Sequence, residues 1–176
     1  MTQPVGGLRA RLIHDNIFYT IKEGLGELGW LGTSLQHETV TVRQDAVKES
    51  ETIRPNVVSV VVEDDWGYPA EMGSKLTDFT WMFYVDVYAE SNAVSLHLAG
   101  DIQAILEGRF TNTVSRLGPQ IEVYDLTQAY ATPVELFSVD VDMVRNDRSR
   151  YYSKPYHEFW RIVSFQVTDT YGTEDY

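Results

Sequence analysis

Hydrophobic residues recur along this chain with two spacings, and the first of them is typical of a helix. Between residues 8 and 28 they fall every three or four positions, at Leu8, Leu12, Ile13, Ile17, Phe18, Ile21, Leu25 and Leu28. This spacing places them on one side of an α-helix. We expect the helix to run from about Leu8 to Gly24. The glycines Gly24, Gly26 and Gly29 weaken the helix there and favour an αL residue at its end.

A second amphipathic helix is predicted in the middle of the chain. Ser91 or Asn92 suits its N-cap position, and Gly108 ends the pattern. The apolar stripe of this helix consists of Val94, Leu98, Ile102, Ile105 and Leu106.

The second spacing, in which apolar residues alternate with polar ones or form short β-branched runs, predicts strands. Residues 79–90 give the clearest one, with Phe79, Trp81, Phe83, Val85, Val87 and Ala89 on one face. Further strands are predicted at 37–44, 57–62, 121–126, 134–144 and 159–167. In the strand at 134–144 the residues expected to share a face are Phe137, Val139, Val141 and Met143. The run at 57–62 is expected to be buried on both sides.

The segments between these elements have loop composition. They are residues 45–55, an acidic edge at 63–65, the segment 66–78 and a long hairpin tip at 145–158. Residues 1–7 and 169–176 are expected to be flexible ends. The element order predicts one α+β domain over residues 1–176, with a mostly antiparallel sheet and two main helices packed on one face.

Composition narrows the function classes. The 26 Asp and Glu against 14 Lys and Arg give a formal charge of −12, which opposes a tight grip on nucleic acid. An acidic surface still suits DNA that must slide past without binding. The chain has no cysteine, so no disulfide is possible. It also lacks a signal-peptide pattern and any apolar run of about 18 residues, so neither export by that route nor membrane insertion is expected.

Motifs for catalysis, cofactors or metals are not found in the sequence. The histidines His14, His37, His97 and His157 do not have metal-ligand spacing. Consecutive carboxylates at Glu63, Asp64 and Asp65 are better explained as an acidic edge than as a cation site, because neighbours on a strand point to opposite sides. No phosphate-binding glycine motif opens a helix. We therefore expect no enzyme activity, cofactor or metal.

Asp140 and Asp142 form the one carboxylate pair with a spacing that suits chemistry. Alternate residues of a strand share a face and lie roughly 7 Å apart. That distance would suit a glycosidase, which needs two carboxyl groups. The sequence lacks an aromatic sugar cleft beside them, so solvent or a channel between subunits is the favoured surrounding.

The basic residues gather in the predicted hairpin tip together with tyrosines. The set is Arg145, Arg148, Arg150, Tyr151, Tyr152, Lys154 and Tyr156. Arginine and tyrosine are enriched at protein interfaces and also serve in nucleic-acid binding. In so acidic a chain we favour docking of this tip against an acidic face of a neighbouring subunit. A solvated loop is the alternative.

The chain resembles the tail terminator proteins of long-tailed, siphovirus-type bacteriophages over about residues 8–168. The resemblance lies in the opening helix at 8–13, the aromatic strand at 79–88, the helix that follows it at 91–107 and the closing strand pair. The insertions at 45–55 and 66–78 depart from the family.

The resemblance implies a structural virion protein without catalytic residues. Its subunits would form a hexameric ring that caps the tail tube and joins it to the head, after assembly in the host cytoplasm. The implied partners are further copies of the chain, the tail tube protein and head–tail connector proteins, and DNA would pass through the channel without specific binding. Asp140 and Asp142 are candidates for lining that channel. Alternatives are another connector, stopper or neck-ring subunit, a monomeric adaptor, or a small hydrolase that uses the carboxylate pair.

Overall fold

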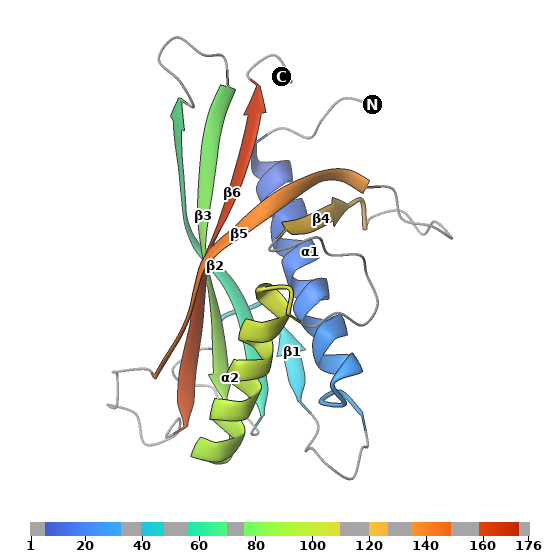
Figure 1. The fold of residues 1–176 in the computed structure, drawn as a ribbon, viewed down its shortest axis with the longest axis vertical. Helices are drawn as coiled ribbons and strands as arrows, with labels where there is room; N and C mark the ends of the chain where they lie inside the picture. The colour runs from blue at the N-terminus through green and yellow to red at the C-terminus, as the bar shows by residue number, and fades with distance from the viewer. Residues whose placement is uncertain are drawn as a thin grey trace.

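In the described part of the chain, the fold combines two helices with one six-stranded sheet (Figure 1). The computed structural model describes residues 6–32, 40–47, 56–69, 76–109, 120–126, 135–148 and 159–172. Both helices lie on one face of the sheet, and all neighbouring strands but β1 and β2 run antiparallel. The predicted fold class is confirmed.

The elements follow one another in the order helix, strands, helix, strands. The helices are α1 (Gly6–Glu27) and α2 (Asn92–Leu106). The strands are β1 (Thr41–Arg43), β2 (Val57–Pro69), β3 (Leu76–Tyr88), β4 (Gln120–Tyr124), β5 (Glu135–Arg148) and β6 (Trp160–Gly172). Across the sheet their order is β1-β2-β3-β6-β5-β4, so the last strand in sequence lies at the centre.

Helix α1 passes through two of the glycines that were expected to weaken its end. A Cβ added at Gly24 would lie 2.7 Å from Ile105 Cδ1 of α2, so the glycine allows the two helices to approach closely. The helix ends before Gly29, whose φ of 84° is the αL conformation predicted for one of the glycines. Trp30 then turns back and is almost fully buried.

Helix α2 agrees with its prediction. The Val94 N–H donates a hydrogen bond of 3.2 Å to Ser91 Oγ, which identifies Ser91 as the N-cap. Leu98, Ile102 and Leu106 of the predicted stripe are buried against the sheet and α1. Gly108, with φ 66°, follows the end of the helix as expected.

Strands β2 and β3 are longer than predicted and form one long hairpin. The acidic edge at 63–65 and residues 66–69 were expected outside a strand, but they continue β2 and pair with residues 77–82 of β3. A bulge between Val62 and Asp64 lets the strand continue through its charged part. The predicted burial on both sides holds only for residues 57–60, because Val62 is already exposed.

Strands β5 and β6 also extend past their predicted bounds. Residues 145–148 belong to β5 rather than to the hairpin tip, and residues 169–172 belong to β6 rather than to a flexible end. Asp169 is in fact buried: Arg9 of α1 donates hydrogen bonds to both of its carboxylate oxygens, one of them 2.8 Å long. The Arg9 guanidinium also lies 3.6 Å from the centroid of the Phe137 ring. This pair fixes the start of α1 to β6.

Two polar side chains of α1 bind the backbones of strands on different sides of the helix. Buried Asn16 accepts a hydrogen bond from the Tyr124 N–H of β4 and donates one of 2.9 Å to the Tyr124 carbonyl. His14 Nε2 lies 3.2 Å from the Val60 carbonyl of β2, and because a carbonyl only accepts, this nitrogen carries the proton. The sheet is thus curled, with α1 held between β2 and the edge strand β4.

Candidate functional site: the open face of the sheet

One face of the sheet is turned away from both helices, and we call it the open face. Within the described residues no helix or strand covers it; the segment at Asp45 reaches it where Ser59 Oγ donates a hydrogen bond of 2.6 Å to the Asp45 carbonyl. The side chains of Val58, Phe83 and Phe165 lie on the opposite face, in the core. Since strand side chains alternate, their neighbours in sequence form the open face.

The middle of the open face mixes apolar and aromatic side chains with polar ones such as Ser164 and Gln166. Val61, Tyr84 and Ser164 lie side by side in the register of β2, β3 and β6. At one end the Tyr88 and Trp160 rings stack with centroids 5.6 Å apart, and Trp160 Nε1 donates a hydrogen bond of 2.9 Å to Asp86 Oδ1. Most of these side chains are only half buried, although they lie in the centre of a sheet. Such a surface is suited to contact with another protein.

Asp140 and Asp142 lie on the open face of β5, next to the apolar middle. They align with Thr168 and Gln166 of β6, and both are exposed. Asp140 Oδ1 accepts a hydrogen bond of 2.8 Å from Gln120 Nε2 of β4. The structure therefore brings the two predicted carboxylates to one exposed surface.

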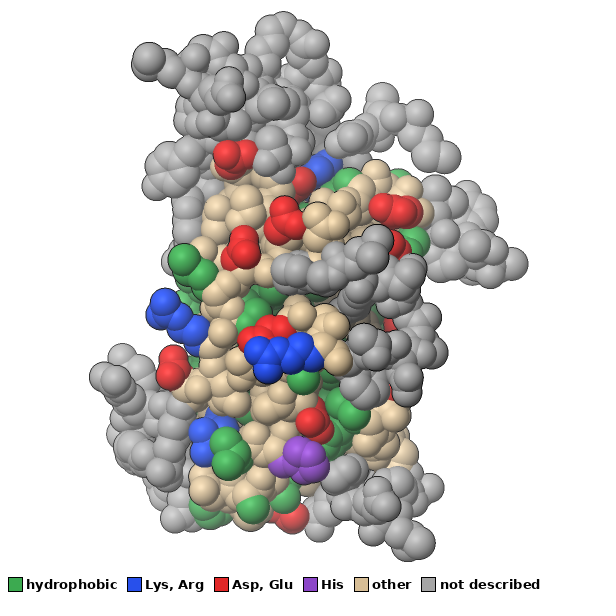
Figure 2. Space-filling view, viewed as in Figure 1, with side chains coloured by type: hydrophobic (Ala, Val, Ile, Leu, Met, Phe, Trp, Pro, Cys, Tyr) green, Lys and Arg blue, Asp and Glu red, His purple; other side chains and the backbone are tan. Residues whose placement is uncertain are grey.

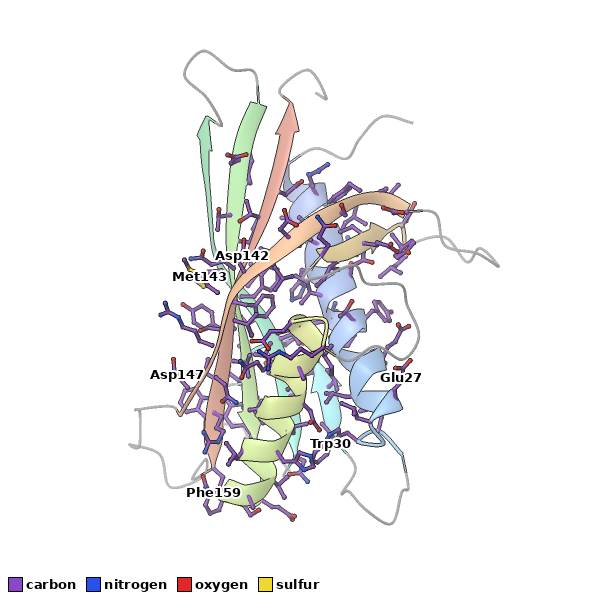
Figure 3. All side chains as sticks on the ribbon, in the orientation of Figure 1. Glu27, Trp30, Asp142, Met143, Asp147 and Phe159 are labelled. Atoms are coloured by element: carbon purple, nitrogen blue, oxygen red, sulfur yellow. The ribbon has the colours of Figure 1, made fainter. Side chains whose placement is uncertain are left out.

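Met143 departs from its predicted place in the core. It was expected to share a face with Val139 and Val141, which are buried, but Met143 is 63% exposed. The cause is a bulge between Asp142 and Arg145, where Met143 adopts a φ of 53°. A left-handed conformation is strained for a methionine. Figure 3 shows Met143 and Asp147 on the side of β5 away from the helices.

The bulge at Met143 could not be read from the sequence. An extra residue in a strand reverses which side chains face the core, and the regular alternation of residues 137–143 gives no sign of it. A glycine or asparagine at this position would have been such a sign, because both adopt positive φ readily, whereas methionine does not.

The structure describes only the first two residues of the predicted basic interface. Arg145 is exposed on the open face, opposite Ser164 of β6. Arg148 ends β5, opposite Arg161. The other members, Arg150, Tyr151, Tyr152, Lys154 and Tyr156, lie outside the described residues.

The described histidines have structural partners. His14 contacts the Val60 carbonyl, and its ring stacks on Phe83 with centroids 6.1 Å apart. His97 packs edge-on against Trp30, and its Nε2 lies 3.5 Å from Asp101 Oδ2. Asp101 also accepts a hydrogen bond of 2.7 Å from Trp30 Nε1. His37 and His157 lie outside the described residues.

Metal-binding clusters and membrane-spanning helices are both absent from the described residues. No group of three or more His, Cys, Asp and Glu residues there could hold a metal ion. Neither described helix is long and apolar enough to cross a membrane. On the face drawn in Figure 2, acidic side chains are spread widely and hydrophobic ones show as separate patches.

Comparison with known proteins adds no assignment. The sequence matches no family model and no curated protein. The open face is therefore the structural feature that bears most directly on function.

Proposed function

We propose that this chain is a structural subunit of a ring, the tail terminator that caps the tail tube of a long-tailed bacteriophage and joins it to the head. It acts without catalysis, as one of six copies around a channel for DNA. Its partners are its own copies, the tail tube protein and head–tail connector proteins, and its place is the neck of the virion.

The open face is the observation that carries this proposal. An antiparallel sheet covered by helices on one side commonly has a polar second side. Here the second side holds Val61, Met82, Tyr84 and Ile162 in its middle and exposed Met143 at its margin. Burial of such apolar side chains against a neighbouring subunit favours assembly, because it removes them from water.

The carboxylates beside this surface favour the proposal that it lines a channel for DNA. Asp140 and Asp142 are exposed on one strand, and the whole chain carries a formal charge of −12. Carboxylates on a surface that faces DNA repel its phosphates, so the DNA passes without sticking.

Native mass spectrometry and electron microscopy of the purified chain test the proposal. We expect a species with six times the 20.1 kDa mass of the chain, seen as a six-fold ring with a central opening. Rings mixed with purified tail tubes should cap one end of each tube. Rings that bind the portal side instead would assign the chain to another connector of the neck. A chain that stays monomeric up to millimolar concentration would refute the ring.

The substitution Met82→Asp tests the apolar middle of the open face. A carboxylate there would lose its hydration when the face is covered, which is costly without a partner. We expect loss of the ring while the circular dichroism spectrum stays that of the wild type. Leu96→Asp is the matched control, because Leu96 is 52% exposed on α2, away from the open face.

A further inference from the structure

Arg145 has no partner for its charge in the part of the chain that the structure describes. Every other Lys or Arg side chain described there has at least one polar, electrostatic or ring contact. Arg145 is exposed on the open face, level with Ser164 of β6 and Tyr84 of β3. Because guanidinium groups bind carboxylates strongly, this free cation is suited to a carboxylate of another molecule.

Met143 projects next to Arg145 and supplies an apolar group. At 63% exposure it is the most exposed of the large apolar side chains in the described residues. The bulge turns it outward at a φ of 53°. Bulges redirect side chains, and strained residues are concentrated at binding sites. Met143 and Arg145 together form a small projection of the open face, which we call the β5 knob.

Helix α1 carries a pair of side chains that complements the β5 knob. Tyr19 is 44% exposed and is the one aromatic residue among the large apolar side chains that are exposed in the described ranges. Glu23 follows one turn later and is also exposed. Its carboxylate has no ion pair or hydrogen bond with any residue that the structure describes. The helix thus presents an aromatic ring beside a free carboxylate.

The two surfaces match in chemistry and in spacing. Residues four apart on a helix, such as Tyr19 and Glu23, have Cβ atoms about 6 Å apart. Two positions along a strand, as from Met143 to Arg145, span about 7 Å. A thioether packs favourably against an aromatic ring. A contact that sets Met143 on the Tyr19 ring therefore brings Arg145 within reach of Glu23.

A second pair of opposite charges lies beside the first. Asp147 is exposed two positions after Arg145, and Figure 3 shows it on the same side of β5 as Met143. On α1, Lys22 is exposed next to Glu23, with its ammonium group 5.7 Å from the centroid of the Phe18 ring. The contact would supply Asp147 with a cation, so like charges are not forced together there.

Within one copy the β5 knob and Tyr19 cannot meet. The knob projects from the open face, whereas α1 packs on the other face of the sheet. Figure 3 shows Met143 on one side of the molecule and Glu27, one turn beyond Glu23, on the other. A helix with its side chains is about 10 Å across, and the sheet adds to this separation. Only a second copy can bring the two surfaces together.

We propose that the β5 knob of one copy docks on α1 of the next copy, with Met143 against Tyr19 and Arg145 paired with Glu23. The contact is heterologous, because each copy offers its knob to one neighbour and its α1 surface to the other. Repetition of such a contact closes a ring. This inference rests on the proposed ring and names the contact between its neighbouring subunits.

Charge exchange tests the contact in the full-length chain. We expect Arg145→Glu and Glu23→Arg each to raise about tenfold the concentration needed for assembly, because every junction then joins like charges. Native mass spectrometry of a dilution series measures this concentration. The double variant Arg145→Glu, Glu23→Arg restores opposite charges at every junction and should assemble like the wild type. Arg109→Glu is the control, because Arg109 is 73% exposed beyond the end of α2 and its reversal gives the same net charge as Arg145→Glu.

Cysteine cross-linking gives a second test, which does not depend on the strength of a charge pair. The chain has no native cysteine, so the introduced thiols are the only ones. Under oxidising conditions the variant Met143→Cys, Tyr19→Cys should give a ladder of disulfide-linked chains up to the full ring on a denaturing gel. A disulfide within one chain would need Cα atoms within about 7 Å, which positions on opposite sides of the molecule do not offer. The matched control Met143→Cys, Leu96→Cys should give little cross-linked material.

The outcomes separate this contact from the proposed function. If the wild type forms a ring but the single reversals leave assembly unchanged, or the double variant fails to regain it, the contact is overturned and the ring stands. A ring without a disulfide ladder above the control has the same meaning. A wild-type chain that is monomeric at all concentrations refutes the ring and the contact together.

Discussion

At the scale of single residues, the pair of Arg9 and Asp169 is the most consequential contact in the fold. Both side chains are almost inaccessible to solvent, with 2% and 4% exposure. A buried ion pair gains little over a well-packed apolar pair, because both ions lose their hydration. Loss of one partner is much worse, since the other charge then stays buried without compensation.

We expect Arg9→Met to lower the free energy of unfolding by about 3–5 kcal/mol in urea titrations, because it leaves the Asp169 carboxyl group buried without the Arg9 guanidinium. Arg11→Met on the same helix is the control. Arg11 is 74% exposed and 3.7 Å from Asp15, and such surface pairs contribute about 0–1 kcal/mol. Equal effects of the two substitutions would contradict the importance given to the buried pair.

Among the elements, the two helices depend on a glycine for their close packing. Gly24 of α1 faces Ile105 of α2, whose Cδ1 and Cγ1 atoms would lie 2.7 and 2.8 Å from an added Cβ. Gly26 of the same helix has a different role. A Cβ added at Gly26 would have only Leu31 Cδ1 nearby, at an ordinary contact distance of 3.6 Å.

Gly24→Ala should destabilise the protein by about 1–3 kcal/mol through overpacking, although alanine is the better helix former. Gly26→Ala should be neutral or stabilise by up to about 1 kcal/mol, since helix propensity acts there without a clash. Thermal and urea unfolding of both variants measure the difference. The double variant Gly24→Ala, Ile105→Val removes the clashing Cδ1 and should regain part of the loss.

The sequence predicted which helices and strands form better than it predicted the residues at which they begin and end. Periodicity located both helices and the core strands, because burial against the sheet imposes it directly. It failed at residues 63–69, where acids, Gly67 and Pro69 have loop composition but β3 supplies hydrogen-bond partners along the whole strand. It failed again at Asp169, whose partner Arg9 is 160 positions away. Local pattern contains no information about such distant partners.

The candidate site was predicted only in part for the same reason. Asp140 and Asp142 share an exposed face as the period of two requires. The exposure of Met143 depends on the bulge in β5, and a bulge is a property of strand pairing that a single strand's sequence does not determine.

On the scale of the whole molecule, α1 holds the curled sheet together. Its Asn16 binds the backbone of Tyr124 in β4, while His14 contacts Val60 in β2. Asn16 also donates a hydrogen bond of 2.9 Å to the Leu12 carbonyl of its own helix. An amide is needed at this position because it must both donate and accept.

We expect Asn16→Leu to remove the hydrogen bonds to the Tyr124 N–H and carbonyl and to cost about 1–3 kcal/mol. Hydrogen exchange should show the Tyr124 amide losing protection more than the amides of β3 and β6. Asn16→Asp is the informative comparison, because it retains the acceptor for the Tyr124 N–H but loses the donor to the two carbonyls. If protection at Tyr124 were the same in all three proteins, α1 would not be what holds β4.

The ion pair between the first helix and the last strand also has a consequence for biosynthesis. Arg9 leaves the ribosome some 160 residues before its carboxylate does, and the central strand β6 is the last to be made. The nascent chain therefore cannot complete its sheet until β6 has been made, and the apolar faces of the helices lack that part of their cover until then. Because so many contacts join distant parts of the sequence, we expect the folding of this chain to be slow.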